Sequence, residues 1–343
     1  AKELGIDVSS ISDEESKAST QDDKPIAKKD KGVIKLKVNK SSKKGFSNVV
    51  LTAISQGLLW AIMAIGVFIT FRILDLADLT AEGAFPLGAA VVASQIQAGQ
   101  NPWLATLFSI LAGMLAGLVS GLLHTKMKIP ALLTGIVTLT GLYSINIKIM
   151  GGVPNLSIGD SSTIFKSVMG LGLSNEEAVF AVSIACLLLV CLILTLLMKT
   201  QIGLVLRSTG DNIPMSEANG VNVDTMKIFG YMISNGLVAL CGALFAQTDG
   251  FSDVTSGTGT IVVGLSAVIL AEVLIHDLTI GGRLLSIGVG AIVYRLIILN
   301  IYEIPNLDQN LVRLFNAILL ALVLFAPEAQ KRLKIRGLKL TSN

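Results

Sequence analysis

The sequence predicts an all-α, polytopic membrane protein with about nine hydrophobic segments, and two observations lead to this fold class. Of the 343 residues, 52% are hydrophobic and only 15% are charged, whereas about 25% of residues are charged in a typical soluble protein. The charges are also unevenly placed, because residues 1–46 hold 11 Lys and 8 acidic residues while long later stretches hold none. Since roughly 20 apolar residues cross the hydrocarbon core as a helix, these stretches indicate membrane spans.

The chain divides into three predicted parts. Residues 1–46 are charged and almost without apolar clustering, which predicts a disordered linker. Residues 47–327 form the predicted transmembrane domain, with a polar loop at 199–227, and residues 328–343 form a basic tail. The apolar segments are 49–71, 84–98, 102–123, 130–149, 177–198, 227–247, 259–275, 283–299 and 309–326.

The second segment, 84–98, is predicted to be a broken or re-entrant helix. It is short, and Asp75, Asp78, Glu82 and Pro86 lie before or within it. A membrane tolerates such a break only where protein or a cavity shields the freed backbone groups. The third and eighth segments instead carry small residues at four-residue spacing, which predicts close helix packing. These are Gly113, Gly117 and Gly121, and Gly282, Ser286 and Gly290.

Lys and Arg in short loops predict the side of the membrane that each loop faces. The 124–128 loop, the 199–207 stretch and the 328–343 tail are basic and predicted to be cytoplasmic, whereas the 150–176 loop is predicted to be external. Counting back through three segments places the N-terminus outside. The nine Lys and one acidic residue of 24–46 favour the inside, which would hold if the first two segments formed a re-entrant pair. We prefer the external N-terminus because several loops agree on it.

No catalytic or cofactor motif is present in the sequence. The G-x-x-x-x-G-K-[ST] phosphate loop and the G-x-S-x-G and H-E-x-x-H motifs are absent, so we expect no enzyme activity and no cofactor in this chain. The cysteines and histidines lack metal-ligand spacing, so no metal site is expected; they are Cys186, Cys191, Cys241, His124 and His276. The polar loop has too few charges for a nucleic-acid patch.

Charged and amide side chains inside apolar segments are costly in a bilayer, and by default they mark a functional path. We therefore predict a translocation path from five such residues. For each, a plain interhelical hydrogen bond or a side chain that snorkels to the interface stays open as the alternative, and the same holds for Arg295 and Asn316. The predicted path residues are Asp75, Asp78, Glu82, Asn235 and Glu272.

The most informative stretch of the sequence is the polar run 206–229, which separates two long apolar segments. It contains a basic residue, a Gly-Asp-Asn triplet, a short helix-compatible run, Gly-Val-Asn-Val-Asp and then a Lys. This order predicts a short helix parallel to the bilayer on a cytoplasmic face, where another protein could push on it.

This polar run resembles the cytoplasmic coupling region of ABC-importer permeases of the branched-chain amino acid, ribose and simple-sugar group. The stretch Phe71–Gly88 is similar to the signature of a narrower branch, which works with lipoprotein receptors for amino acids, including aromatic ones. The resemblance covers about residues 48–327. The coupling motif reads Gly210-Asp211-Asn212, Ser216-Glu217-Ala218, Gly220-Val221-Asn222-Val223 and Lys227.

The resemblance implies a permease subunit of an ATP-driven importer in the bacterial cytoplasmic membrane, which forms the path for a small polar solute such as an amino acid. Two copies, expected to form a homodimer, would enclose the path within membrane lipid. Separate cytoplasmic subunits would bind ATP, and an external substrate-binding protein would deliver the solute.

The resemblance also implies roles within the coupling loop. The short helix would enter a groove of the ATPase, with Glu217 facing that subunit. Gly210 and Gly220 would allow sharp turns on either side, and Asp211 or Asn212 would cap the helix N-terminus. The predicted ATPase-coupling residues are Gly210, Asp211, Asn212, Ser216, Glu217, Ala218 and Gly220.

Two further hypotheses concern the N-terminus and the energy source. Residues Ala1–Val8 are similar to the closing residues of that branch's substrate-binding proteins, so we hypothesise an external receptor fused to the permease through the Lys-rich linker. The rival class is a secondary transporter driven by an ion gradient, in which Glu272 or Asp78 would hold the ion. That class does not account for the polar run.

Overall fold

The computed structural model describes residues 40–159, 161–170, 172–275 and 279–302, with isolated positions between 314 and 325. The described residues from 43 onward belong to one structural unit. The predicted tail at 328–343 and most of the ninth segment lie outside the described residues. So do residues 1–39 of the predicted linker, whereas the first helix already begins at Lys40.

The described residues are predominantly helical, which confirms the all-α class. Among them, six helices are long and apolar enough to cross a membrane. Each of the first eight predicted segments overlaps one helix, and the count of nine stays a prediction. The helices matching these segments are α1 (Lys40–Phe68, continued by the π-helical turn η1, Ile69–Ile73), α2 (Ala81–Gln97), α3 (Pro102–Thr125), α4 (Ala131–Ile149), α6 (Asn175–Lys199), α9 (Val223–Asp249), α10 (Thr260–Leu274) and α11 (Ile280–Tyr302).

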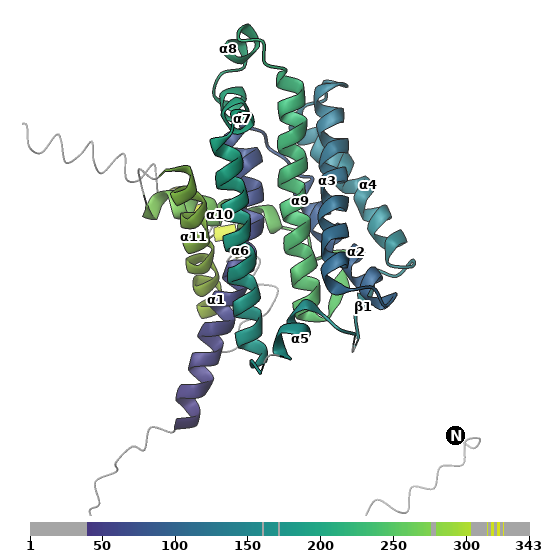
Figure 1. Cartoon of the computed structure of the whole chain (residues 1–343), viewed down its shortest axis with the longest axis vertical. Helices are drawn as coiled ribbons and strands as arrows, with labels where there is room; N and C mark the ends of the chain where they lie inside the picture. Colours follow the sequence, from purple (N-terminus) through teal and green to yellow (C-terminus); the bar gives the residue numbers. More distant parts are fainter. Residues whose placement is uncertain are drawn as a thin grey trace, which may run out of the picture. The chain divides into compact units, whose positions relative to one another are not determined.

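The two ends of the bundle carry different elements (Figure 1). At one end, called the α8 end, lie α7 (Gln201–Asp211) and α8 (Ile213–Ala218). At the other, called the strand end, lie α5 (Ile164–Met169) and the antiparallel pair of β1 (Asn155–Ser157) and β2 (Phe251–Asp253). The all-α prediction did not include these two strands.

Helix α9 is the central helix of the bundle, packed lengthwise against α3 and α2. The contact with α3 uses the predicted glycine seam. A Cβ added at Gly117 would collide with the Tyr231 carbonyl, one at Gly121 would lie 2.9 Å from the Ile228 Cα, and Gly113 is similarly close to α9. The seam is thus a packing surface that permits close approach of two backbones.

The predicted break before the second segment is present. After η1 the chain leaves the helix at residues 74–80, where Asp75 has a φ of 54°. Helix α2 then starts inside the protein, because Thr80 and Ala81 are buried. Contacts with α3, α4 and α9 shield this start, as a broken membrane helix requires.

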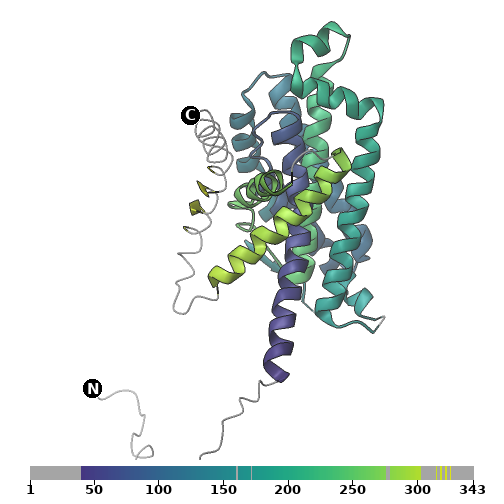
Figure 2. The ribbon, with the colours of Figure 1, turned by 90° about the vertical axis from the view of Figure 1, so that its left-hand side faces the viewer.

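Helices α10 and α11 form a pair beside α1. Helix α11 runs obliquely across the bundle (Figure 2). A Cβ at Gly57 of α1 would lie 2.8 Å from the Ile292 Cα, and one at Gly290 would collide with the Ala267 carbonyl of α10. These close contacts bring Arg295, one turn beyond Ile292, next to α1.

The outer helices present apolar surface. Leu111 and Leu115 on α3 and Leu192 and Leu196 on α6 are large and exposed. In a chain with spans of this length, such surfaces face lipid, because the bilayer core is as apolar as these side chains.

Candidate functional site

The short helix predicted on the polar run is α8. Asn212 caps it, because its Oδ1 accepts a hydrogen bond from the Met215 N–H at 3.0 Å. Gly220 follows with a φ of 78°, and Asn222 caps α9 by accepting from the Thr225 N–H at 3.1 Å. Of the two expected caps, Asn212 is the N-cap of α8, whereas Asp211 is the last residue of α7. Gly220 allows the turn that was predicted there.

The predicted turn at Gly210 is wrong. Gly210 lies within α7, where an added Cβ would collide with the carbonyl oxygen of Ile73 at the end of η1. The absence of a side chain therefore lets α7 pack directly on η1. The physical reason for glycine at this position is close approach, and the turn occurs two residues later, where Asn212 adopts an extended conformation.

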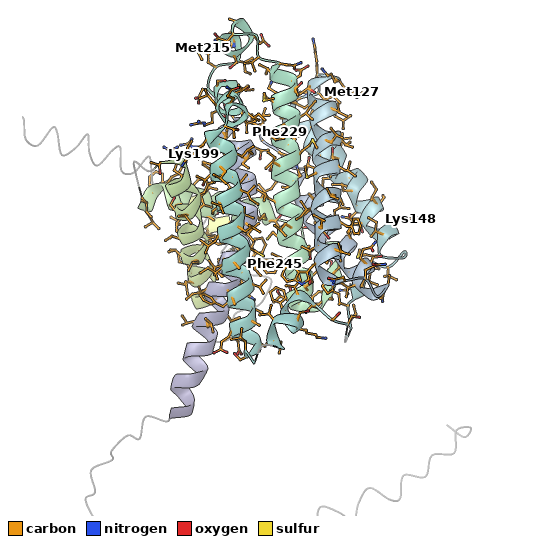
Figure 3. All side chains as sticks on the ribbon, in the orientation of Figure 1. Met127, Lys148, Lys199, Met215, Phe229 and Phe245 are labelled. Atoms are coloured by element: carbon orange, nitrogen blue, oxygen red, sulfur yellow. The ribbon has the colours of Figure 1, made fainter. Side chains whose placement is uncertain are left out.

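The residues of α8 divide into an outer and an inner group. Ile213 and Met215 are 39% and 51% exposed, and Glu217 and Ala218 are also exposed. Met215 projects at the extremity of the α8 end in Figure 3. Ser216 is buried, and its Oγ has no hydrogen-bond partner in the described part of the chain. Two exposed apolar side chains beside a carboxylate form a small amphipathic surface suited to a protein contact.

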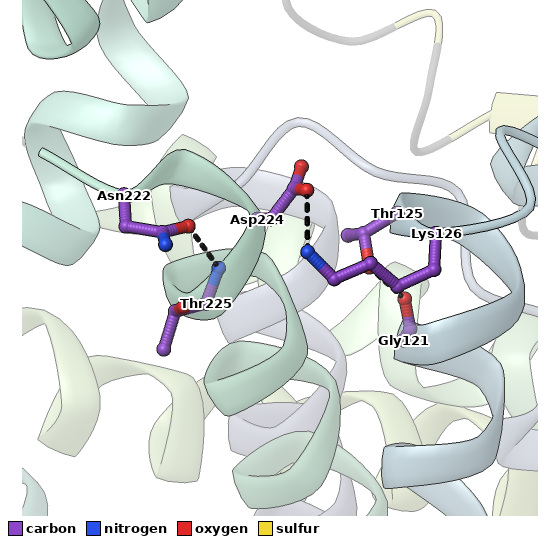
Figure 4. A network of polar contacts seen from close by, with 6 residues as sticks. All are labelled: Gly121, Thr125, Lys126, Asn222, Asp224 and Thr225. Atoms are coloured by element: carbon purple, nitrogen blue, oxygen red, sulfur yellow. Dashed lines mark hydrogen bonds and ion pairs between the residues drawn. The ribbon is translucent and has the colours of Figure 1, made fainter.

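The start of α9 is tied to the end of α3 (Figure 4). Lys126 Nζ lies 3.0 Å from Asp224 Oδ2, and the neighbouring Thr125 hydroxyl donates to the Gly121 carbonyl at 2.8 Å. Both charged side chains are about half exposed, so the ion pair contributes less than about 1 kcal/mol. Its effect is to orient the α8–α9 junction relative to α3.

Two of the predicted path residues meet in the interior. Asn235 Nδ2 donates to Asp78 Oδ2 at 2.8 Å, and the Thr80 N–H donates to Asp78 Oδ1 at 2.9 Å. Both partners of the first bond are buried. The Thr80 hydroxyl lies 2.7 Å from that of Ser120, which in turn donates to Thr138 at 2.8 Å. A line of polar groups thus joins the 74–80 loop to α9, α3 and α4.

The other three predicted path residues lie apart from this line. Glu82 Oε1 accepts the Gly259 N–H at 3.0 Å and holds the start of α10. Glu272 forms an ion pair of 2.8 Å with Arg72 of η1. Asp75 is exposed in the loop. The structure brings Asp78 and Asn235 together and distributes the others over separate contacts, so their role in translocation stays a prediction.

A cavity of about 260 Å³ lies at the strand end, between α1, α2, α9, α11 and β2. One wall is aromatic, because Trp60, Phe85 and Phe245 have ring centroids 5.0 to 5.9 Å apart. The remaining lining is largely polar or charged. The polar lining residues are Gln56, Asp249, Ser252, Asp253, Ser256 and Arg295.

Sequence reasoning did not assign this cavity. It noted Arg295 as a polar residue inside a segment, but it gave the aromatic residues no role. A usable signal was present: Gln56 and Trp60 are four apart, as are Phe245 and Asp249, so each pair shares a helix face. What the sequence could not show is that these two faces, from α1 and α9, border the same space.

The bundle, the capped α8 and the polar interior define a class of protein, a polytopic α-helical membrane protein with a short exposed helix at one end. Residues 49–327 match the family described as "Branched-chain amino acid transport system / permease component". The chain belongs to this family, and it is a permease subunit of an ABC importer, as its sequence predicted.

Individual relatives agree with this assignment. The chain is 38% identical over 293 residues to the tyrosine transport system permease protein of Clostridioides difficile, covering 85% of this chain and 95% of the relative. It is 30% identical to the autoinducer 2 import system permease protein LsrC of Yersinia enterocolitica, over 75% of this chain and 65% of that one. Among solved structures, PsaBC from Streptococcus pneumoniae in complex with Fab has a TM-score of 0.52 at 14% identity, covering 84% of this chain and 94% of that chain. That last likeness bears on the fold alone.

Proposed function

We propose that α8 couples this permease to a separate cytoplasmic ATPase, and that the solute it carries is an amino acid. The observation that carries the coupling role is α8 itself, a short helix capped by Asn212 that exposes Ile213 and Met215 at one end of the bundle. The amino-acid assignment is supported by the 38% identical relative, which is named for tyrosine transport.

Two routes would transmit a movement of α8 into the membrane. Asn222 starts α9 just after α8, and α9 packs along α3 through the glycine seam. Before α8 in the chain, Gly210 of α7 packs directly against η1, the continuation of α1. Packed helices respond to displacement by shifting between discrete arrangements. ATPase closure at the α8 end would therefore favour one of two global states of the bundle.

The α8 end is assigned to the cytoplasm and the strand end to the outside. Helix α1 starts at the strand end (Figure 1), and this supports the external N-terminus that the parity of the loops predicted. An external substrate-binding protein would dock at the strand end, and the fusion hypothesis would attach it through residues 1–46. A second copy of the chain would complete the path as a homodimer.

ATP would be bound and hydrolysed on the partner subunit, with no catalytic residue or cofactor in this chain. Within the bundle, Asp78 and Asn235 would hold the 74–80 loop in one position, and Glu82 and the Arg72–Glu272 pair would hold α10. The ion-driven alternative is set aside, because the chain belongs to a family of ABC permeases.

Affinity purification from the native membrane tests the coupling role. A Glu217→Arg variant reverses a charge on the outer face of α8, and Glu176→Arg, at the start of α6 near the strand end, is the matched control. We expect an ATP-binding subunit to co-purify with the unaltered chain and with the control but to be lost with Glu217→Arg. Retention of the ATPase by Glu217→Arg would refute the assigned contact. Recovery of the chain alone, with ion-driven uptake intact in vesicles, would refute the proposed function.

A further inference from the structure

We propose that the cavity at the strand end is a substrate-binding site within the permease itself, selective for a free α-amino acid with an aromatic side chain. The inference rests on the proposed function and deepens it, because it places selectivity in the membrane subunit as well as in an external receptor.

The aromatic wall supplies the side-chain end of the site. Trp60 and Phe85 are stacked, with centroids 5.6 Å apart and an interplanar angle of 3°, and Phe245 is tilted 51° against Trp60 at 5.0 Å. Aromatic rings prefer such stacked and tilted neighbours. A ligand ring can therefore extend a cluster that already exists.

Arg295 supplies a group for the ligand carboxylate. Its Nε donates to Gln56 Oε1 at 2.9 Å, and its Nη2 contacts the same oxygen. Gln56 thus orients a planar guanidinium on the cavity wall, and a guanidinium binds a carboxylate through two parallel hydrogen bonds. A charge inside the apolar span 280–299 is costly, so such residues are rare and by default mark a functional site.

Asp249 supplies a group for the ligand ammonium. Within the described residues, no hydrogen bond to its carboxylate is found, whereas Asp253 already accepts the Thr255 N–H and hydroxyl at 2.6 Å each. Of the two acidic groups that line the cavity, Asp249 is therefore the one without a hydrogen bond in the described part of the chain. The positive charge of Arg295 acts on it, so the cavity presents two opposite charges to a ligand. It lies at the end of α9, one turn beyond Phe245 of the aromatic wall.

Ser252 is an independent indication of a missing ligand. It is buried and lines the cavity, yet its Oγ has no hydrogen-bond partner among the described residues. Buried hydroxyls are nearly always hydrogen-bonded, because an unmade bond costs free energy. A carboxylate or ammonium group in the cavity would meet this need.

Size and charge narrow the ligand class. A volume of about 260 Å³ is just below the ~300 Å³ at which sites for drug-sized ligands begin, which suits a single small molecule. A neutral sugar also packs on aromatic rings, but it would bring no charge to either Arg295 or Asp249. A zwitterion brings one charge of each sign, so the lining favours an amino acid.

The test uses the full-length chain in lipid nanodiscs and the fluorescence of Trp60. The sequence has two tryptophans, and the second, Trp103, is 56% exposed on α3 and does not line the cavity. A Trp103→Phe background therefore leaves Trp60 as the reporter. The probes are L-phenylalanine, phenethylamine, which lacks the carboxylate, and 3-phenylpropionate, which lacks the ammonium.

We expect a saturable change with L-phenylalanine and binding of the other two probes weaker by about tenfold to a hundredfold, the usual effect of losing a charged hydrogen bond. Arg295→Gln should abolish the discrimination against phenethylamine, and Asp249→Asn that against 3-phenylpropionate. These paired changes in selectivity are specific to ligand contacts, and a general structural defect would not produce them. If the Arg295→Gln variant does not fold, the Asp249→Asn variant provides the test, because Asp249 is exposed and its substitution should leave the fold intact.

No saturable response of Trp60, or equal affinity for all three probes, would overturn the inference. Recovery of the ATPase subunit, measured with the same Trp103→Phe background, separates the two proposals. An ATPase that is recovered without a Trp60 response refutes only the cavity assignment. A selective Trp60 response without ATPase recovery supports the cavity assignment and refutes the coupling role of α8.

Discussion

Helix α8 and the cavity at the strand end are held by opposite kinds of interaction. At the α8 end, Asn212 bonds Met215 and Asn222 bonds Thr225, so each cap joins residues three positions apart. At the strand end, Gln56 bonds Arg295 across 239 positions, and the aromatic wall combines α1, α2 and α9. The caps that shape α8 are therefore encoded locally, whereas the cavity depends on how distant helices pack.

This difference matters for how the two ends respond to substitution. A local motif can lose one hydrogen bond and leave the bundle intact, because its partners are neighbours in the chain. The cavity at the strand end, in contrast, changes its shape whenever one of the helices that border it shifts. Single substitutions test this contrast, and their expected effects on stability differ in size.

The largest effect is expected from Gly117→Val, which forces α3 and α9 apart. The added Cβ would collide with the Tyr231 carbonyl, and such overpacking should reduce the free energy of unfolding by about 3 kcal/mol or more. Thermal unfolding of the solubilised protein measures this. Gly141→Val on α4 is the control, since a Cβ there meets nothing within 4 Å. Equal stability of the two variants would show that the seam does not hold the bundle together.

A smaller effect is expected from Asn235→Leu, which removes a donor from the buried Asp78 carboxylate. Losing a hydrogen bond to a charged group should cost about 2 kcal/mol, again measured by thermal unfolding. In the Asn235→Leu variant, the buried Asp78 carboxylate lacks this donor. The double variant Asp78→Asn with Asn235→Leu replaces that carboxylate with a neutral amide, so it should recover part of the stability. A double variant whose loss equals the sum of the two single losses would contradict a direct coupling of these side chains.

Asn212→Ala should cost about 1 kcal/mol and act only on α8. Hydrogen exchange measures it, with faster exchange expected at the Met215 amide and unchanged exchange in α3 and α9. The control is Asp211→Ala, because Asp211 is not the cap. If the whole bundle loses protection with Asn212→Ala, the α8 end is not the independent, locally encoded unit described above.

The smallest effect is expected from Lys126→Ala. The exposed ion pair with Asp224 should contribute less than about 1 kcal/mol, and added salt should reduce that contribution in the unaltered protein. Thermal unfolding at low and high salt provides the measurement. A large, salt-independent loss would indicate that Lys126 has a further partner within this chain.

The short-range features were accessible from the sequence. Apolar segments of the right length predicted the helices, and Asp75, Asp78 and Glu82 before a short segment predicted the break that precedes α2. The resemblance left Asp211 and Asn212 as the two candidate caps of α8, and the structure places Asn212 in that position. The exception is Gly210, whose role is set by Ile73, a residue 137 positions earlier, since 210 − 73 = 137.

The sequence by itself determined the class of protein and the short helix α8, because helix length, polarity and capping depend on residues within a few positions of one another. Only the tertiary structure decided which polar residues meet. It joined Asp78 to Asn235, separated Glu272 from both, and placed Gln56, Trp60 and Arg295 around one cavity. The physical reason is that a membrane span reveals its apolar length in the sequence, whereas the rotation and crossing of each helix are set by contacts with its neighbours.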